Sequence, residues 1–225
     1  GKSSLTKSKS SLQSKSSLPD NSDAMCISCD GKDIEAIAAG GILCSLLQQE
    51  TSAMLRGNLV LLADCDRQVD PIALRHCIAV SRAVVTLLTP KTLENIEQVQ
   101  VIAMTSAGGV HDIPVRTPSF IFPGEDYYTS FLPMLLGSAV AFGVEKSIRA
   151  FFEHIAVPLS THASESILNA EVVQILARVP KTPQTEPNKQ VLAMEPLVKL
   201  GGASTRFLGQ EAEDGISQTN PSSPA

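Results

Sequence analysis

The sequence predicts a doubly wound, flavodoxin-like α/β domain, in which helices flank a parallel sheet. Two observations carry this prediction. Several short segments are apolar throughout, as strands buried on both faces are. The segments between them carry apolar residues at helical spacing. Strands and helices that alternate in this way pack as a parallel sheet with right-handed crossovers. The functional loops of such a sheet lie at the carboxyl ends of its strands.

Four segments are predicted as strands because each is short, apolar and bounded by polar or turn-forming residues. They span residues 25–29, 59–63, 83–88 and 113–120. Asp30-Gly31-Lys32 follows the first strand, Asp64 to Arg67 follows the second, and Thr89-Pro90 follows the third. We therefore expect these three loops to lie together at the functional edge of the sheet.

Helices are predicted where apolar residues recur at every third or fourth position. They span residues 34–50, 72–81, 89–109, 145–155 and 164–179, with a further helical region after Phe122-Pro123. Asp33 is predicted to cap the first helix, and Thr89 and Pro90 to be the N-cap and first residue of the third. Gly40 and Gly41 cost the first helix about 1 kcal/mol each relative to Ala, so we expect close packing there.

Composition divides the chain into three parts. Residues 1–23 are rich in Ser and Lys and are predicted to be disordered. Their serines lie beside lysines and would also suit a phosphorylation tract. Residues 24–179 hold the α/β domain, with extra helices at its C-terminal end. Residues 180–225 are rich in Pro and are predicted to be a disordered tail. The apolar island 191–194 within that tail could also dock on the domain or on a partner.

Charge and cysteine content exclude several classes of function. A net charge of −5 argues against nucleic-acid binding, which needs clustered Lys and Arg. No apolar run is long enough to span a membrane, and no signal-peptide pattern is present, so we expect a cytoplasmic protein. Cys26 and Cys29 have the spacing of a metal knuckle, but no second pair accompanies them and the four His are scattered. We expect reduced, buried thiols and no metal site.

The segment from residue 72 to 101 resembles the central segment of Toll/interleukin-receptor (TIR) domains. Together with weaker similarity at the first, second and fourth strands, the resemblance covers about residues 24–135. The matching positions are Ile78, Ser81-Arg82, Val84-Val85, Leu87-Leu88, Thr89-Pro90 and Leu93, with Asp33 and Glu35 after the first strand, Asp64 after the second, and 113–115 with Phe120 and Phe122-Pro123 in the fourth-strand region.

The resemblance implies an intracellular signalling module that binds other proteins, including copies of itself, and needs no cofactor. In TIR domains the loop after the second strand mediates homotypic contacts. The interface residues implied here are Asp66, Arg67, Asp70 and Pro71, although this loop is short and lacks the Gly that is common in the family.

Two alternatives remain open. TIR members that hydrolyse NAD use a Glu on the third helix. Alignment to the family without gaps places this catalytic position at Gln100 or Val101. Glu97 is the nearest Glu, and it lies one helical turn before that position. NAD is implied only under this reading. A degenerate phospho-receiver domain would use Asp64 as the phosphoacceptor and Thr89 as the switch hydroxyl. The simpler interpretation is that strand-end Asp residues cap the helices that follow them.

Overall fold

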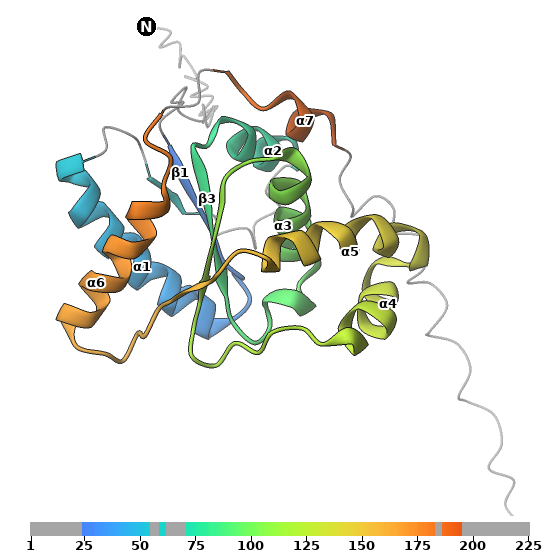
Figure 1. Ribbon diagram of the computed structural model, residues 1–225, viewed down its shortest axis with the longest axis horizontal. Coiled ribbons are helices and arrows are strands. Elements are labelled where there is room, and N and C mark those ends of the chain that lie inside the picture. Colours follow the sequence, from blue (N-terminus) through green and yellow to red (C-terminus); the bar gives the residue numbers. More distant parts are fainter. Residues whose placement is uncertain (1–23, 55–58, 62–70, 183–185, 195–225) are drawn as a thin grey trace, which may run out of the picture.

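The computed structural model describes residues 24–54, 59–61, 71–182 and 186–194 (Figure 1). Within this part of the chain, five strands form one sheet, in the order β2-β1-β3-β4-β5, and every pairing is parallel. This order is that of the flavodoxin-like fold, so the predicted fold class is confirmed. The strands are β1 (Met25–Ser28), β2 (Leu59–Leu61), β3 (Ala83–Leu88), β4 (Asp112–Arg116) and β5 (Val157–Pro158).

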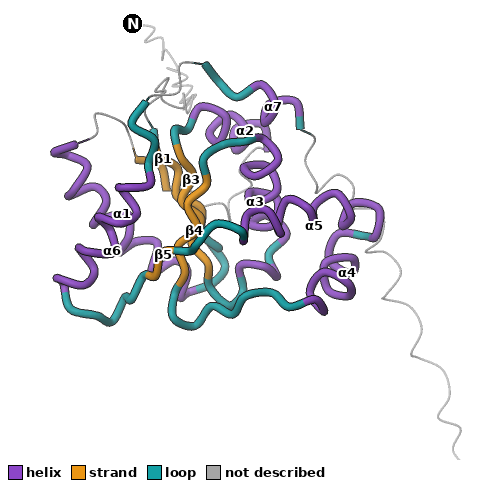
Figure 2. Tube along the Cα trace, viewed as in Figure 1, coloured by secondary structure: helices purple, strands orange, loops and turns teal. Residues whose placement is uncertain are grey.

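Helices cover both faces of the sheet (Figure 2). One face carries α1 (Ile34–Met54) and α6 (Glu165–Arg178), and the other carries α2 (Pro71–Val80), α3 (Ile96–Gly108) and α5 (Ser138–Phe152). The remaining helical elements are the 3₁₀ turn η1 (Thr92–Glu94), the π-helical turn η2 (Tyr127–Phe131), α4 (Leu132–Leu136) and the short α7 (Lys189–Ala193).

The apolar strands fill the cores on both sides of the sheet. In β1, Met25 and Ile27 pack under α1 and α6, whereas Cys26 packs under α2 and α3. All six residues of β3 are buried, with Val85 and Leu87 on the α1 side. Successive side chains of a strand point to opposite faces, so a central strand covered on both sides buries side chains on both faces and is mostly apolar. In β3 the polar exception is Thr86.

Gly40 confirms the expected close packing of α1. A Cβ atom at this position would lie 2.9 Å from Cys29 Sγ and 3.8 Å from Leu87 Cδ2, so a larger residue fits only if the Cys29 side chain moves. Gly41 faces open space and has no such requirement.

The predicted start of the third helix is wrong. After β3 the chain first forms η1, and α3 begins only at Ile96, with Asn95 Oδ1 accepting the Glu97 N–H at 2.9 Å as the N-cap contact. The Thr89 hydroxyl donates to Asp33 at 2.7 Å, and the Thr89 N–H donates to Thr92 Oγ1 within the turn that precedes α3. The C-terminal end of α3 agrees with the sequence, since Gly109 adopts the left-handed conformation with φ of 65°.

Several other predicted boundaries also change. The first strand ends at Ser28, and the fourth runs over Asp112–Arg116 because the chain turns after it, where the Phe120 N–H donates to Thr117 O. The helix expected over 145–155 spans residues 138–152. The edge strand β5 was not predicted, since two residues carry no periodicity.

The predicted disordered tail is wrong for residues 186–194. These residues include α7, which packs on α2 and α3 and buries Val191 completely (Figure 1). Asn188 fixes its start: its N–H donates to Ala79 O at 2.8 Å, and its side-chain amide donates to Gly108 O at 2.6 Å. Gly108 makes room for the helix, because a Cβ there would lie 2.3 Å from Val191 Cγ2. Residues 1–23, 183–185 and 195–225 of the two predicted tails lie outside the described residues.

Across the described ranges, no helix combines the length and apolar character needed to cross a bilayer.

Candidate functional site

Polar side chains meet at the carboxyl ends of β1 and β3, the two central neighbours in the sheet. The chain leaves these strands in opposite directions along the sheet, and such a switch point is where α/β folds bind ligands or partners. The side chains come from the loop after β1, from the loop after β3 and from the start of α3; they are Ser28, Asp30, Asp33, Thr89, Thr92, Asn95 and Gln98.

Asp33 joins the first two of these segments. Its Oδ2 accepts a hydrogen bond from the Thr89 hydroxyl at 2.7 Å, and its Oδ1 accepts the Glu35 N–H at 3.2 Å. The Glu35 contact confirms Asp33 as the cap of α1. Thr92 Oγ1 in turn accepts the Thr89 N–H at 2.8 Å. The carboxylate, although buried, therefore has donors on both oxygens.

Asp30 and Gln98 join β1 to α3. Asp30 Oδ1 accepts from the Lys32 N–H at 2.9 Å and from the Asn95 amide at 2.7 Å. The Gln98 amide donates to Cys29 O at 2.8 Å and its Oε1 accepts from the Ser28 hydroxyl at 2.8 Å. We call these contacts, with those of Asp33, the carboxyl-edge network. These hydrogen bonds hold the loop after β1, the loop after β3 and the start of α3 together.

Glu97 lies on the rim of this network. Its carboxylate is 3.7 Å from Lys32 Nζ, and the Glu97 side chain is 39% exposed. Gln100 and Val101, the alternative positions for a catalytic acid, are buried within the packing of α3. Glu97 is therefore the only one of these three residues whose side chain reaches solvent at the carboxyl edge.

Most of the predicted interface falls outside the described residues. Asp66, Arg67 and Asp70 are not described, and of Pro71 the structure shows only that it begins α2. Asp64, the residue considered as a phosphoacceptor, also lies outside the described residues. The Thr89 hydroxyl, considered as its switch group, donates to Asp33.

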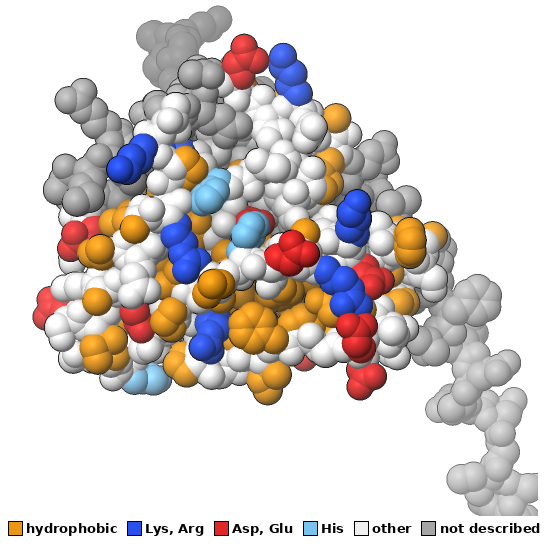
Figure 3. Space-filling view, viewed as in Figure 1, with side chains coloured by type: hydrophobic (Ala, Val, Ile, Leu, Met, Phe, Trp, Pro, Cys, Tyr) orange, Lys and Arg blue, Asp and Glu red, His pale blue; other side chains and the backbone are white. Residues whose placement is uncertain are grey.

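Apolar side chains surround the carboxyl-edge network. Ile34, at the start of α1, and Ile121, in the loop after β4, are each 83% exposed. The Ser119 hydroxyl donates to a Glu35 carboxylate oxygen, which holds the loop after β4 against α1. Phe122 follows, stacked edge-on against Phe120. Figure 3, which views the strands from the side, shows hydrophobic side chains gathered in the lower middle of the molecule, with basic and acidic ones beside them.

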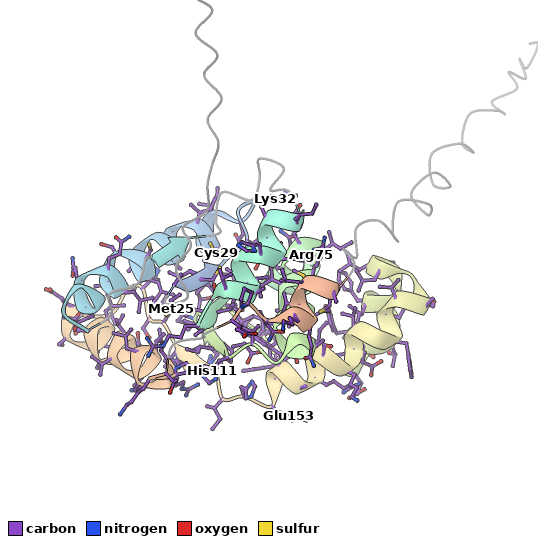
Figure 4. The ribbon with its side chains drawn as sticks, turned by 90° about the horizontal axis from the view of Figure 1, so that it is seen from above. Met25, Cys29, Lys32, Arg75, His111 and Glu153 are labelled. Carbon is purple, nitrogen blue, oxygen red and sulfur yellow. The ribbon has the colours of Figure 1, made fainter. Side chains whose placement is uncertain are left out.

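A second polar cluster lies at the opposite, amino edge of the sheet. A hollow of about 380 Å³ between the C-terminal ends of α3 and α5 is lined by His111, Asp112, Glu153 and His154. His154 Nδ1 lies 2.9 Å from Asp112 Oδ1, and the Asp112 side chain is 3% exposed. Figure 4 shows His111 and Glu153 together, well away from Lys32.

Burial raises the pKa of the Asp112 carboxyl above its ordinary value, against the opposing effect of His154 and His111. The amino-edge cluster was missed in the sequence, where the histidines look scattered, because only the fold brings residues 111 and 154 together. Asn95 carried a signal that was overlooked, since it directly precedes a helical apolar pattern.

Within the described part of the chain, no group of three or more His, Cys, Asp or Glu side chains is arranged to hold a metal ion.

Comparison with known proteins adds no relative: no family model matches the chain, and neither a curated protein nor a solved structure matches it.

Proposed function

We propose that the chain is an intracellular protein-interaction module of TIR-like type, which binds a second copy of itself through the carboxyl edge of its sheet. One observation carries the proposal. This edge presents exposed apolar side chains, Ile34 and Ile121, around a network whose two carboxylates, Asp30 and Asp33, already have hydrogen-bond donors. Because protein donors already occupy these carboxylates, they are poorly placed to act on a substrate. Clustered exposed apolar residues, by contrast, are typical of contact surfaces.

The charges at this edge support a homotypic partner. Lys32 and Glu97 are both partly exposed, so the surface offers both signs of charge and can complement itself. The resemblance of residues 72–101 to TIR domains supports the same choice, because the loop after the second strand makes homotypic contacts in that family. In this chain the corresponding residues 66–71 come after β2 in the sequence, and only Pro71 among them belongs to the described residues.

The proposal is tested by light scattering over a concentration series of the parent and three variants. We expect the average mass of the parent to rise with concentration. Ile34→Ser with Ile121→Ser, and separately Arg67→Glu with Asp70→Lys, should stay monomeric. Phe142→Ser is the matched control, because Phe142 is 84% exposed on α5 and lies outside this edge. A parent that stays monomeric, or two edge variants that assemble like the parent, would overturn the proposal.

A second candidate, NAD hydrolysis, rests on the position of Glu97. This carboxylate lies at the carboxyl edge and reaches solvent there, as a group that acts on a bound ribose must. The test is to incubate the purified chain with NAD and measure released nicotinamide. Release by the parent that disappears in Glu97→Gln would favour the enzyme, and no release by the parent would exclude it.

A further inference from the structure

Two buried cysteines lie in direct contact on the α2 side of the sheet. Cys26, in β1, and Cys77, in α2, have their Sγ atoms 3.4 Å apart. Cys26 is fully buried and Cys77 is 5% exposed. The two residues come from different elements and are 51 positions apart in the sequence, so the fold itself creates the pair.

We propose that Cys26 and Cys77 form a redox-active dithiol that peroxide converts into a disulfide between β1 and α2. A disulfide has an S–S bond of about 2.05 Å, so the two sulfurs must approach by roughly 1.3 Å. Each thiol lies on a regular element of the same packed core, and rotation of the side chains about χ1 moves sulfur atoms over such a distance.

The surroundings of Cys77 favour its thiolate, the form that reacts with peroxide. The thiol of Cys26 hydrogen-bonds to Cys77 and, as the largest effect, lowers the pKa of Cys77. Burial opposes this effect and a contact with Ser81 adds to it, and the result is a pKa below the ordinary value. Cys44, which lies on α1 away from the pair, shows the contrast, because burial raises the pKa of its thiol.

The chemistry balances with hydrogen peroxide as the oxidant. The Cys77 thiolate attacks one peroxide oxygen, the O–O bond breaks, and Cys77 sulfenic acid forms as hydroxide leaves. The sulfur of Cys26 then attacks the Cys77 sulfur, the S–O bond breaks and water leaves. Overall, two thiols and one peroxide give one disulfide and two waters, and the two electrons pass from the sulfurs to the peroxide.

The α7 helix lies over the cluster that contains the pair. Val191 is fully buried in the same group of packed side chains as Cys26 and Cys77, and Arg75 of α2 donates to the carbonyl of Met194 just after α7. Figure 4 shows Arg75 beside this segment. A reagent as small as peroxide suits a site covered in this way, and a bulky disulfide such as oxidised glutathione does not.

The experiment treats the reduced full chain with increasing hydrogen peroxide, removes the peroxide, alkylates the remaining thiols and maps tryptic peptides by mass spectrometry. We expect a reducible linkage between the peptides 16–32 and 76–82. Cys26 and Cys29 fall in the same peptide, so fragmentation between them identifies the linked sulfur. Cys44→Ala should form the same linkage, whereas Cys77→Ala should leave Cys26 alkylated.

The peptide map of the unaltered chain decides the question, whether or not a variant folds. A linkage at Cys29 or Cys44 in place of Cys26 would overturn the proposal. So would Cys77 recovered as sulfinic acid without a linkage, or Cys26 and Cys77 both still alkylated at peroxide levels that oxidise Cys44.

Discussion

The two edges of the sheet give their buried carboxylates different hydrogen-bond partners. At the carboxyl edge, Asp33 accepts hydrogen bonds from a hydroxyl and a backbone amide. Both donors are uncharged groups. At the amino edge, Asp112 has a histidine as its partner and borders an open hollow. Similar buried carboxylates therefore form a fixed support at the carboxyl edge and a pH-dependent contact at the amino edge.

The carboxyl-edge network should carry the larger share of stability. Thr89→Val removes the hydroxyl that donates to Asp33 and leaves a buried carboxylate oxygen without that donor. We expect a loss of about 1–3 kcal/mol in the free energy of unfolding, measured by urea denaturation. Thr129→Val is the control, because the Thr129 hydroxyl also donates a hydrogen bond, to the backbone carbonyl of Glu125, but is exposed, and this variant should change stability by less than about 0.5 kcal/mol. Equal losses in the two variants would contradict a structural role for the network.

The central architecture could be predicted because it depends on local patterns. A run such as residues 83–88, apolar at every position except Thr86, allows few interpretations besides a strand buried on both faces, and the structure places β3 over the same residues. The expectation that the loops after the first and third strands meet also holds, because parallel strands end at one edge.

The remaining features depend on contacts between residues distant in sequence. The sequence places Thr89 where an N-cap is expected, but its hydroxyl donates to Asp33, 56 positions away in the sequence. Asn95 is the residue that caps α3. The island around Val191 looks too short to fold, and it docks only because Gly108 leaves room for it. Neither contact can be predicted from the local sequence. The interface predicted at Asp66, Arg67 and Asp70 stays a prediction.

The amino edge should make stability depend on pH. The pKa of Asp112 is raised in the folded state, so the folded chain keeps this proton in a range where the unfolded chain has released it. Stability from this group is therefore fully present below the ordinary carboxyl pKa of about 4, and falls as pH rises towards the raised value. Asp112→Asn removes this group's titration, so unfolding measured between about pH 4 and 7 should show a smaller loss with rising pH.

Glu153→Gln provides the control for this pH profile. Glu153 lines the same hollow, alongside His111 and His154, but the ion pair to His154 comes from Asp112. We expect Glu153→Gln to keep the pH dependence of the parent. Identical profiles for the parent and Asp112→Asn would show that the buried carboxylate does not set the response.

The smallest change in the free energy of unfolding should come from the Lys32–Glu97 pair at the rim of the carboxyl edge. This pair lies between the buried network and the exposed apolar side chains. Lys32→Met removes the ion pair with Glu97, whose atoms are 3.7 Å apart and whose side chains are 58% and 39% exposed. Water and salt screen such a pair, so the free energy of unfolding should change by less than about 0.5 kcal/mol. Lys32 is the better residue to replace, because Glu97 also interacts with the N-terminus of α3. The Lys32 backbone N–H, which donates to Asp30, is retained in the variant. A loss above about 1 kcal/mol by urea denaturation would mean that the pair belongs to the supporting network, and the surface proposed for self-association would then begin further out, at Ile34 and Ile121.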